Sequence, residues 1–419
     1  MEKILSTKID FKALLCLPVV FILLYPYSLN SLLTHEQKLV LDALTILVSV
    51  FSILAYIMRV KVDRLMLVLL AYLGVMLIST AYNDGKIIEV MFVAPDFPII
   101  RILGMCAFAA CVIRYSVSTF YAAFLLYLTL IIVINLITIV VFPGGMYTTG
   151  QMENYFLGYD NTHCVVFYLA LTVSFIRDYV KGATGRGISI TTAFLLIIVN
   201  ISVIMCMSGA SVVQLALFDL LFVYAVVTKR SLLSFKAAVA VNVCFSIFLL
   251  FVFTNTGSEL ISFIAENVLH KDATFTARTF IWQRSEYYIA AQPIIGYGWN
   301  TDLAIIRLHA YHSHNQYLTD LYYGGFPMLL LLIGMTLLVA VRLDKYRNQA
   351  IYPMLLCVFF ATLFHWNVES MHIPLQLLTF TIIYSVGIFE EERNRRKKVE
   401  TEYAKTIASL KSRQLHKQD

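Results

Sequence analysis

The sequence predicts an all-α polytopic membrane protein with about twelve transmembrane helices. Hydrophobic residues make up 59% of the 419 residues and charged residues only 14%, which is outside the usual range of soluble domains. A helix needs about 20 apolar residues to cross a bilayer, and apolar runs recur along the whole chain. They cover residues 13–29, 39–58, 65–82, 102–118, 119–142, 163–176, 188–207, 211–228, 237–254, 326–341, 351–366 and 373–389.

The distribution of basic residues supports this division into helices. Short loops on the cytoplasmic side of a membrane carry most of the Lys and Arg residues. With the N-terminus inside, 25 of the 32 Lys and Arg residues fall on one side and seven on the other. Both termini are therefore expected in the cytoplasm, and the largest loop is expected on the outer face.

The predicted helices divide the chain into four parts. Helices 1 to 9 take residues 1–254, a large outward-facing loop takes 255–325, helices 10 to 12 take 326–389, and a basic cytoplasmic tail takes 390–419. The first apolar run is long and lacks a small-residue cleavage site, so a retained helix is expected there. The basic cluster of the tail is expected to touch anionic lipid headgroups.

The sequence lacks the patterns that are typical of several classes of function. The seven cysteines lie almost all in apolar runs without a CxxC pair, which indicates packing residues. No HExxH spacing, P-loop or dinucleotide fingerprint occurs. His312 and His314 alone are too few to bind a metal ion. We therefore expect no metal, no cofactor and no nucleic-acid partner.

The large outer loop carries the candidate chemistry, because it holds four of the seven outer basic residues. Apolar residues at helical spacing in residues 276–288 predict a short amphipathic helix on the membrane surface. Arg278 and Trp282 share one face of this helix, and Arg284 lies about 120° away. A guanidinium binds phosphate bidentately. Alternatively, each arginine pairs with a lipid phosphate or with a nearby carboxylate such as that of Glu286.

His314 is expected at the outer mouth of the helix bundle. The segment 293–300 should turn the chain back toward it, because proline ends a helix and glycines permit positive φ. A neutral imidazole near pH 7 can take a proton from an attacking hydroxyl group. The alternative is a histidine that simply satisfies a polar neighbour.

Two sets of residues carry a resemblance to a known family. The first set is Arg278, Trp282, Pro293, Gly296, Gly298, His314, Asn315 and Gly325, in that order. The second is the Phe-Leu-Gly-Tyr-Asp-Asn segment at 156–161, in the outer loop before the sixth predicted helix. Together with the twelve-helix topology, they resemble the bacterial O-antigen polymerases and O-antigen ligases.

The resemblance implies a metal-independent membrane glycosyltransferase of the GT-C type, on the outer face of the bacterial inner membrane. Its donor would be an undecaprenyl-diphosphate-linked oligosaccharide, and inversion at the anomeric carbon is expected by analogy. In the family, loop arginines hold the diphosphate and a loop histidine is thought to activate the acceptor hydroxyl. These roles fall on Arg278 and His314. Membrane lipids, a flippase and a chain-length regulator are the other implied partners.

The chain departs from the family pattern at one position. Family members often carry an arginine after the seventh helix, where this chain has Ala210 and Ser211. Arg101 is the candidate replacement, because a charge at the start of an apolar helix is costly without a partner. Snorkelling to the headgroups is its alternative. Arg284 and Arg307 are weaker candidates for the diphosphate.

Further polar and aromatic residues are candidates for acceptor or sugar contacts. They are His312, Asn315, Trp282, Tyr317 and Asn161. The aromatic residues suit sugar stacking, although an interfacial aromatic belt explains them equally well. His365, Glu369 and His372 lie between the last two predicted helices, where capping of helices is the expected role and lining of the acceptor cleft the alternative.

The predicted function is the polymerisation of lipid-linked repeat units into O-antigen or capsular polysaccharide. The alternative within the family is a ligase that transfers polysaccharide to a glycolipid or another acceptor, and the sequence does not separate the two. A transporter or flippase for lipid-linked sugars is less favoured, because no internal repeat relates the two halves of the chain. A structural membrane protein would leave the arginines and histidines of the outer loop unexplained.

Overall fold

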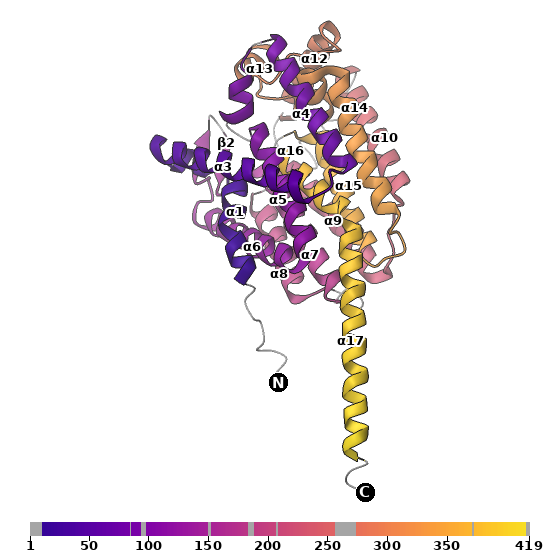
Figure 1. The fold of residues 1–419 in the computed structure, drawn as a ribbon. Helices are drawn as coiled ribbons and strands as arrows, with labels where there is room; N and C mark the ends of the chain where they lie inside the picture. Colours follow the sequence, from indigo (N-terminus) through magenta and orange to yellow (C-terminus); the bar gives the residue numbers. More distant parts are fainter. Residues whose placement is uncertain are drawn as a thin grey trace.

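The computed structural model describes residues 11–83, 85–93, 98–149, 152–182, 188–206, 208–255, 274–370 and 373–415, and these residues are mostly helical (Figure 1). Each predicted apolar run overlaps a helix. The helices are α1 (Phe11–Leu24), α2 (Leu29–Leu32), α3 (His35–Arg59), α4 (Arg64–Asn83), α5 (Ile99–Tyr115), α6 (Val117–Val141), α7 (His163–Val180), α8 (Ile190–Cys206), α9 (Gly209–Thr228), α10 (Phe235–Asn255), α12 (Thr274–Ala291), α13 (Thr301–Leu308), α14 (Gln316–Asp344), α15 (Tyr352–Val368), α16 (Ile373–Tyr384) and α17 (Val386–Leu415). A π-helical turn covers Glu89–Val93, and a 3-10 turn covers Asp160–Thr162.

The described helices are those of a multi-pass membrane protein. Six are long and apolar enough to cross a membrane, and the number is seven if α16 and α17, which meet at a 45° bend, form one span. Four shorter apolar helices, α1, α8, α10 and α15, accompany them. The total of twelve membrane spans remains a prediction, and so does their GT-C arrangement.

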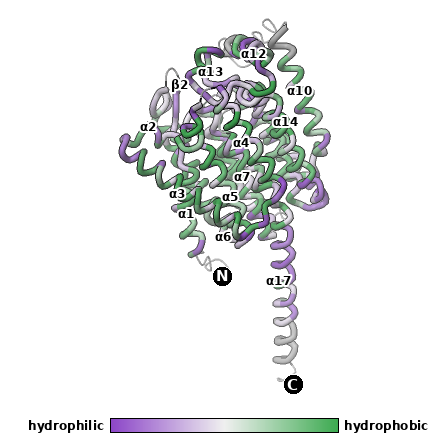
Figure 2. The backbone as a smooth tube through the Cα atoms, turned by 45° about the horizontal axis from the view of Figure 1, so that its top comes forward, coloured by the Kyte–Doolittle hydropathy of each residue, from purple (hydrophilic) through white to green (hydrophobic). Residues whose placement is uncertain are grey.

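The two ends of the molecule differ in character. Helices α12 and α13 lie at one end, and α17 extends from the opposite end, where α1 begins (Figure 1). Hydrophobic residues dominate the middle of the helical body, whereas hydrophilic residues gather near β2 and along the start of α17 (Figure 2). The sides of the membrane on which the loop region and the tail lie remain predictions.

A small antiparallel sheet between α6 and α7 was not predicted. Its strands are β1 (Tyr147–Thr149), β2 (Met152–Tyr155) and β3 (Gly158–Tyr159), in the order β1-β2-β3. The backbone N–H of Leu157 donates to Asn135 Oδ1 of α6 at 2.9 Å, which ties the sheet to the bundle. Strands this short do not show a readable alternation of polar and apolar residues.

Helix α14 is broken near its start, at Gly325. Gly325 has φ +64°, which interrupts the helical hydrogen bonds and leaves carbonyl groups of the preceding turn available. One of these, the carbonyl of Tyr322, accepts a 2.7 Å hydrogen bond from the N–H of Tyr297. A Cβ atom on Gly296 would lie 2.7 Å from the backbone nitrogen of Gly325, so only glycine fits there. The predicted turn after α12 is thereby packed against the break.

Candidate active site

The turn directly before α14 holds the two loop histidines. Asn315 caps α14, since its Oδ1 accepts from the backbone N–H of Leu318 at 3.1 Å. Its Nδ2 donates to the carbonyl of Asn367 at 3.1 Å, which joins the turn to the end of α15. His314 has φ +49°, an unfavourable backbone conformation for a residue other than glycine. Such strain persists only where surrounding contacts fix it, and it is often found at functional sites.

A buried carboxylate next to α15 gathers groups from three parts of the chain. Glu369 is fully buried at the end of α15. Its Oε2 lies 3.2 Å from Nδ1 of His314 and 3.9 Å from Nη2 of Arg278, and its Oε1 lies 3.7 Å from Nδ1 of His312. The predicted diphosphate ligand Arg278 and the predicted base His314 are thus brought together by a residue that was expected only to cap a helix or line a cleft. We call these four residues the Glu369 cluster.

The neighbours of Glu369 keep its carboxyl group ionised. Burial by itself raises the pKa of the Glu369 carboxyl, but the adjoining His314, which also donates a hydrogen bond to it, His312 and the Arg278 guanidinium hold the pKa well below its usual range. The carboxylate is therefore a permanent acceptor at neutral pH.

The hydrogen-bond network assigns a tautomer to each imidazole. The backbone N–H of His314 donates to Nδ1 of His312 at 3.2 Å, and the Ser370 hydroxyl lies 2.8 Å from the same nitrogen. Because His312 Nδ1 accepts, its ring proton belongs on Nε2. His314 Nδ1 faces the ionised carboxylate of Glu369 at 3.2 Å, so it carries the proton and donates. The lone pair of His314 is then on Nε2, where it can accept a proton.

His312, His314 and Glu369 also have the composition of a three-ligand metal site. Their ligand atoms lie within 4.8 Å of one another. The surroundings disfavour a cation, however. Nδ1 of His312 already accepts the N–H of His314, and the Arg278 guanidinium lies 3.9 Å from the same carboxylate. The contacts therefore fit an ion-pair cluster better than a metal centre.

A cavity of about 560 Å³ opens beside the histidines. His312 and His314 line it together with residues from the small sheet and from several helices. The residues from the sheet are Thr149, Met152, Asn154 and Tyr159, and apolar residues on the helices include Leu73, Met76, Ile102 and Leu377. A cavity with extensive apolar walls and a few polar groups suits an amphipathic ligand.

The other two arginines of the outer loop contact each other at the junction of α12 and α13. The Nε of Arg284 donates to the backbone carbonyl of Arg307. The guanidinium of Arg307 lies over the ring of Tyr297, 4.3 Å from its centroid, and 5.8 Å from that of Tyr288. Within the described residues, neither arginine contacts the Glu369 cluster. Their roles in diphosphate binding stay predictions.

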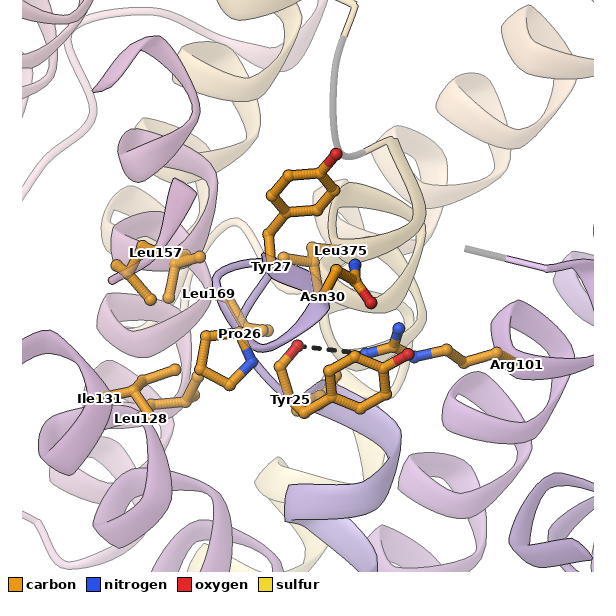
Figure 3. A pocket seen from close by; sticks show the side chains of 12 residues that line it. Tyr25, Pro26, Tyr27, Asn30, Arg101, Leu128, Ile131, Leu157, Leu169 and Leu375 are labelled. Carbon is orange, nitrogen blue, oxygen red and sulfur yellow. Dashed lines mark hydrogen bonds between the residues drawn. The ribbon is translucent and has the colours of Figure 1, made fainter. Parts of the chain in front are cut away.

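Arg101 is engaged with the end of α1 (Figure 3). Its Nε donates to the carbonyl of Leu23 at 2.9 Å and its Nη2 to that of Tyr25 at 3.2 Å, while its guanidinium lies 3.7 Å from the centroid of the Tyr25 ring. The last carbonyls of a helix lack partners within the helix and favour a nearby cation. The adjoining cavity has about 30 Å³, which is room for a water molecule and not for a diphosphate. Arg101 therefore stabilises the end of α1 in this structure. Its binding of a diphosphate remains a prediction.

Three other candidate residues have partners inside the protein. Trp282 is 2% exposed, and its indole N–H donates to the carbonyl of Ser313 at 2.7 Å, which supports the histidine turn from α12. The Tyr317 hydroxyl donates to Asn242 Oδ1 at 2.7 Å. Asn161 accepts from the Ser208 hydroxyl. Direct sugar contacts by these residues, like one by Asn315, stay predictions.

The central position of Glu369 in the site was not predicted from the sequence, which indicated only a capping or cleft-lining residue. A signal was present, because a charged residue next to an apolar helix is costly unless it has partners on the same side of the membrane. His365 lies inside α15, where its Nδ1 is 2.8 Å from Oε1 of Gln214. His372 lies outside the described residues.

Replacing Glu369 with glutamine is expected to lower the melting temperature of the solubilised protein at neutral pH, because breaking a buried ion pair costs about 3 kcal/mol or more. The depressed pKa of Glu369 adds stability above the unfolded-state pKa, and this stability is lost as the pH falls through the folded-state pKa. The difference in melting temperature between wild type and Glu369→Gln should therefore stay constant from pH 7 to about pH 5 and shrink only as the pH is lowered below 4.5, the ordinary pKa of a glutamate.

Glu153→Gln, at an exposed position of β2, is the matched control and should follow the wild type at every pH. A constant difference between wild type and Glu369→Gln across the pH range would contradict the assigned ion pairs.

Comparison with known proteins shows that part of the chain is similar to a known family. The model of the O-antigen ligase family matches residues 192–333, which include Arg278, His314 and Gly325. Among curated proteins, no sequence matches the chain significantly. The family match confirms the resemblance for the loop motif that runs from Arg278 to Gly325, whereas the segment at 156–161 lies outside the matched residues.

Proposed function

We propose that this protein is a membrane glycosyltransferase that joins undecaprenyl-diphosphate-linked repeat units into O-antigen or capsular polysaccharide. The observation that carries the proposal is the convergence of His314 and Arg278 on the buried carboxylate of Glu369 beside a cavity suited to an amphipathic ligand. The family match to an O-antigen ligase supports the same reaction class.

His314 is the proposed general base. An acceptor hydroxyl attacks the anomeric carbon of the donor saccharide, and Nε2 of His314 takes the hydroxyl proton. Glu369 acts as a positioning residue, because its carboxylate accepts the Nδ1 proton of His314 at 3.2 Å and stabilises the imidazolium that forms. The new C–O bond forms as the bond to the diphosphate breaks.

Arg278 is the proposed partner of the leaving group. The undecaprenyl diphosphate departs with the electron pair of the broken bond, and a guanidinium can offset its charge with paired hydrogen bonds. Arg278 is held by a 2.8 Å hydrogen bond from its Nη1 to the carbonyl of Val368, and its side chain is 16% exposed, so that a ligand can reach it.

The proposed location is the outer face of the bacterial inner membrane, with both termini in the cytoplasm. The positions of α12 and α13 at one end and of α17 at the other support this orientation (Figure 1). A flippase that supplies the donor and a chain-length regulator are the proposed partners.

A synthesis assay tests the proposal. Purified protein in detergent is incubated with lipid-linked repeat units isolated from membranes, with and without a metal chelator, and the products are separated by size. A ladder of saccharides that survives chelation is expected. Transfer of preformed polysaccharide to a glycolipid without any ladder would reassign the protein as a ligase. Absence of any saccharide transfer would refute the proposal.

A further inference from the structure

The wall of the cavity contributed by α14 contains a second polar group beyond the Glu369 cluster. Gln316, Thr319 and Asp320 lie on one face of the first turns of α14 and line the cavity with Tyr72 of α4. Asp320 is fully buried. Its Oδ1 accepts from the Tyr72 hydroxyl at 2.9 Å and from Nε2 of Gln316 at 2.6 Å.

Two oxygen atoms of this group have no hydrogen-bond partner among the described residues. They are Oδ2 of Asp320 and Oε1 of Gln316, and both are buried. A buried acceptor without a partner costs free energy, and nearly all such atoms in proteins are satisfied by protein, water or ligand. The two oxygens therefore call for hydrogen-bond donors supplied from the cavity that these residues line.

Neighbouring hydroxyl groups of a saccharide supply donors of this kind. A carboxylate and an amide on adjacent turns of one helix can accept from two hydroxyls at once. A polyprenyl chain has no donors, and a diphosphate brings negative charge, so neither suits Asp320. We propose that Asp320 and Gln316 form a saccharide-binding subsite that accepts hydrogen bonds from sugar hydroxyl groups. This inference rests on the proposed function, since it presumes a saccharide substrate.

The position of the subsite gives it a role in substrate choice. Gln316 follows His314 by two residues, and Asp320 lies about one turn further along α14. A sugar held by this pair is presented next to the proposed base. A site built to accept from hydroxyl groups rejects analogues that lack them, because its buried oxygens are then left unpaired. Asp320 and Gln316 are therefore binding and specificity residues, not catalytic ones.

Binding measurements with two ligands test the subsite. The parent protein carries His314→Asn to prevent turnover. Its dissociation constants are measured for the isolated lipid-linked repeat unit and for undecaprenyl diphosphate, which lacks the sugar. Asp320→Asn and Gln316→Met are each expected to weaken binding of the repeat unit by about 10-fold or more. Binding of undecaprenyl diphosphate should stay unchanged.

Matched substitutions at exposed positions provide the controls. Asp302→Asn on α13 and Gln283→Met on α12 should leave both affinities unchanged. Equal weakening of both ligands by Asp320→Asn and Gln316→Met would assign the pair a purely structural role and overturn the inference. Unchanged binding of the repeat unit would overturn it while leaving the glycosyltransferase proposal intact. A third outcome would refute both the subsite and the glycosyltransferase proposal. In it, the parent protein binds the repeat unit no more tightly than undecaprenyl diphosphate, and the wild type transfers no saccharide.

Discussion

Replacing His314 with asparagine is expected to lower the rate of saccharide transfer by about 10²–10⁴-fold, the usual contribution of a general base. Asparagine is the informative replacement because it tolerates the positive φ of +49° at this position, so backbone strain is not added. Its amide can still donate toward Glu369. The change therefore removes mainly the lone pair at Nε2 of His314.

The rate is measured as product formed from the lipid-linked repeat unit at saturating substrate, alongside its dissociation constant, which should change little. His35→Asn, at the exposed start of α3, is the control and should keep the wild-type rate. A His314→Asn variant within tenfold of the wild type would show that another group takes the proton.

Removing Arg278 is expected to have the second largest effect. Arg278→Ala should lower kcat/KM by about 10²–10³-fold, the loss typical when a group that stabilises developing negative charge is deleted. Arg278→Lys should recover part of the activity, because lysine keeps the charge but loses the forked geometry. Arg284→Ala should lower kcat/KM less than tenfold, since Arg284 contacts the backbone of Arg307 and not the Glu369 cluster.

Initial rates over a range of repeat-unit concentrations give these values. Arg347→Ala, at an exposed position after α14, serves as the control. If Arg284→Ala proved as damaging as Arg278→Ala, the diphosphate would have to bind at the junction of α12 and α13.

The helical part of the fold could be read from the sequence because long apolar runs have one stable solution in a bilayer, the hydrogen-bonded helix. The number of spans could not be fixed in the same way. Helices such as α8 and α15 are apolar but short, and their packing, not their composition, decides whether they cross the membrane. The sheet between α6 and α7 escaped prediction because its strands have two to four residues.

Part of the candidate site could also be predicted from the sequence. Arg278 and His314 stand in a polar loop between apolar runs, where their chemistry is conspicuous. Glu369 contacts His314 across 55 residues of sequence, and a single acid at the end of a helix has the appearance of a cap. Arg101 was expected to bind substrate, but it contacts the protein backbone. Its partners are backbone carbonyls of Leu23 and Tyr25, and backbone acceptors leave no trace in a pattern of side chains.

The position of Glu369 in the chain also has a consequence for biosynthesis. The ribosome makes Arg278 and His314 long before it makes the carboxylate that holds them. The Glu369 cluster is complete only after α15 has packed against α14, which brings residue 369 to the histidine turn. A nascent chain that still lacks α15 therefore has Arg278 and His314 but not the Glu369 cluster, which forms only when the C-terminal helices have joined the bundle.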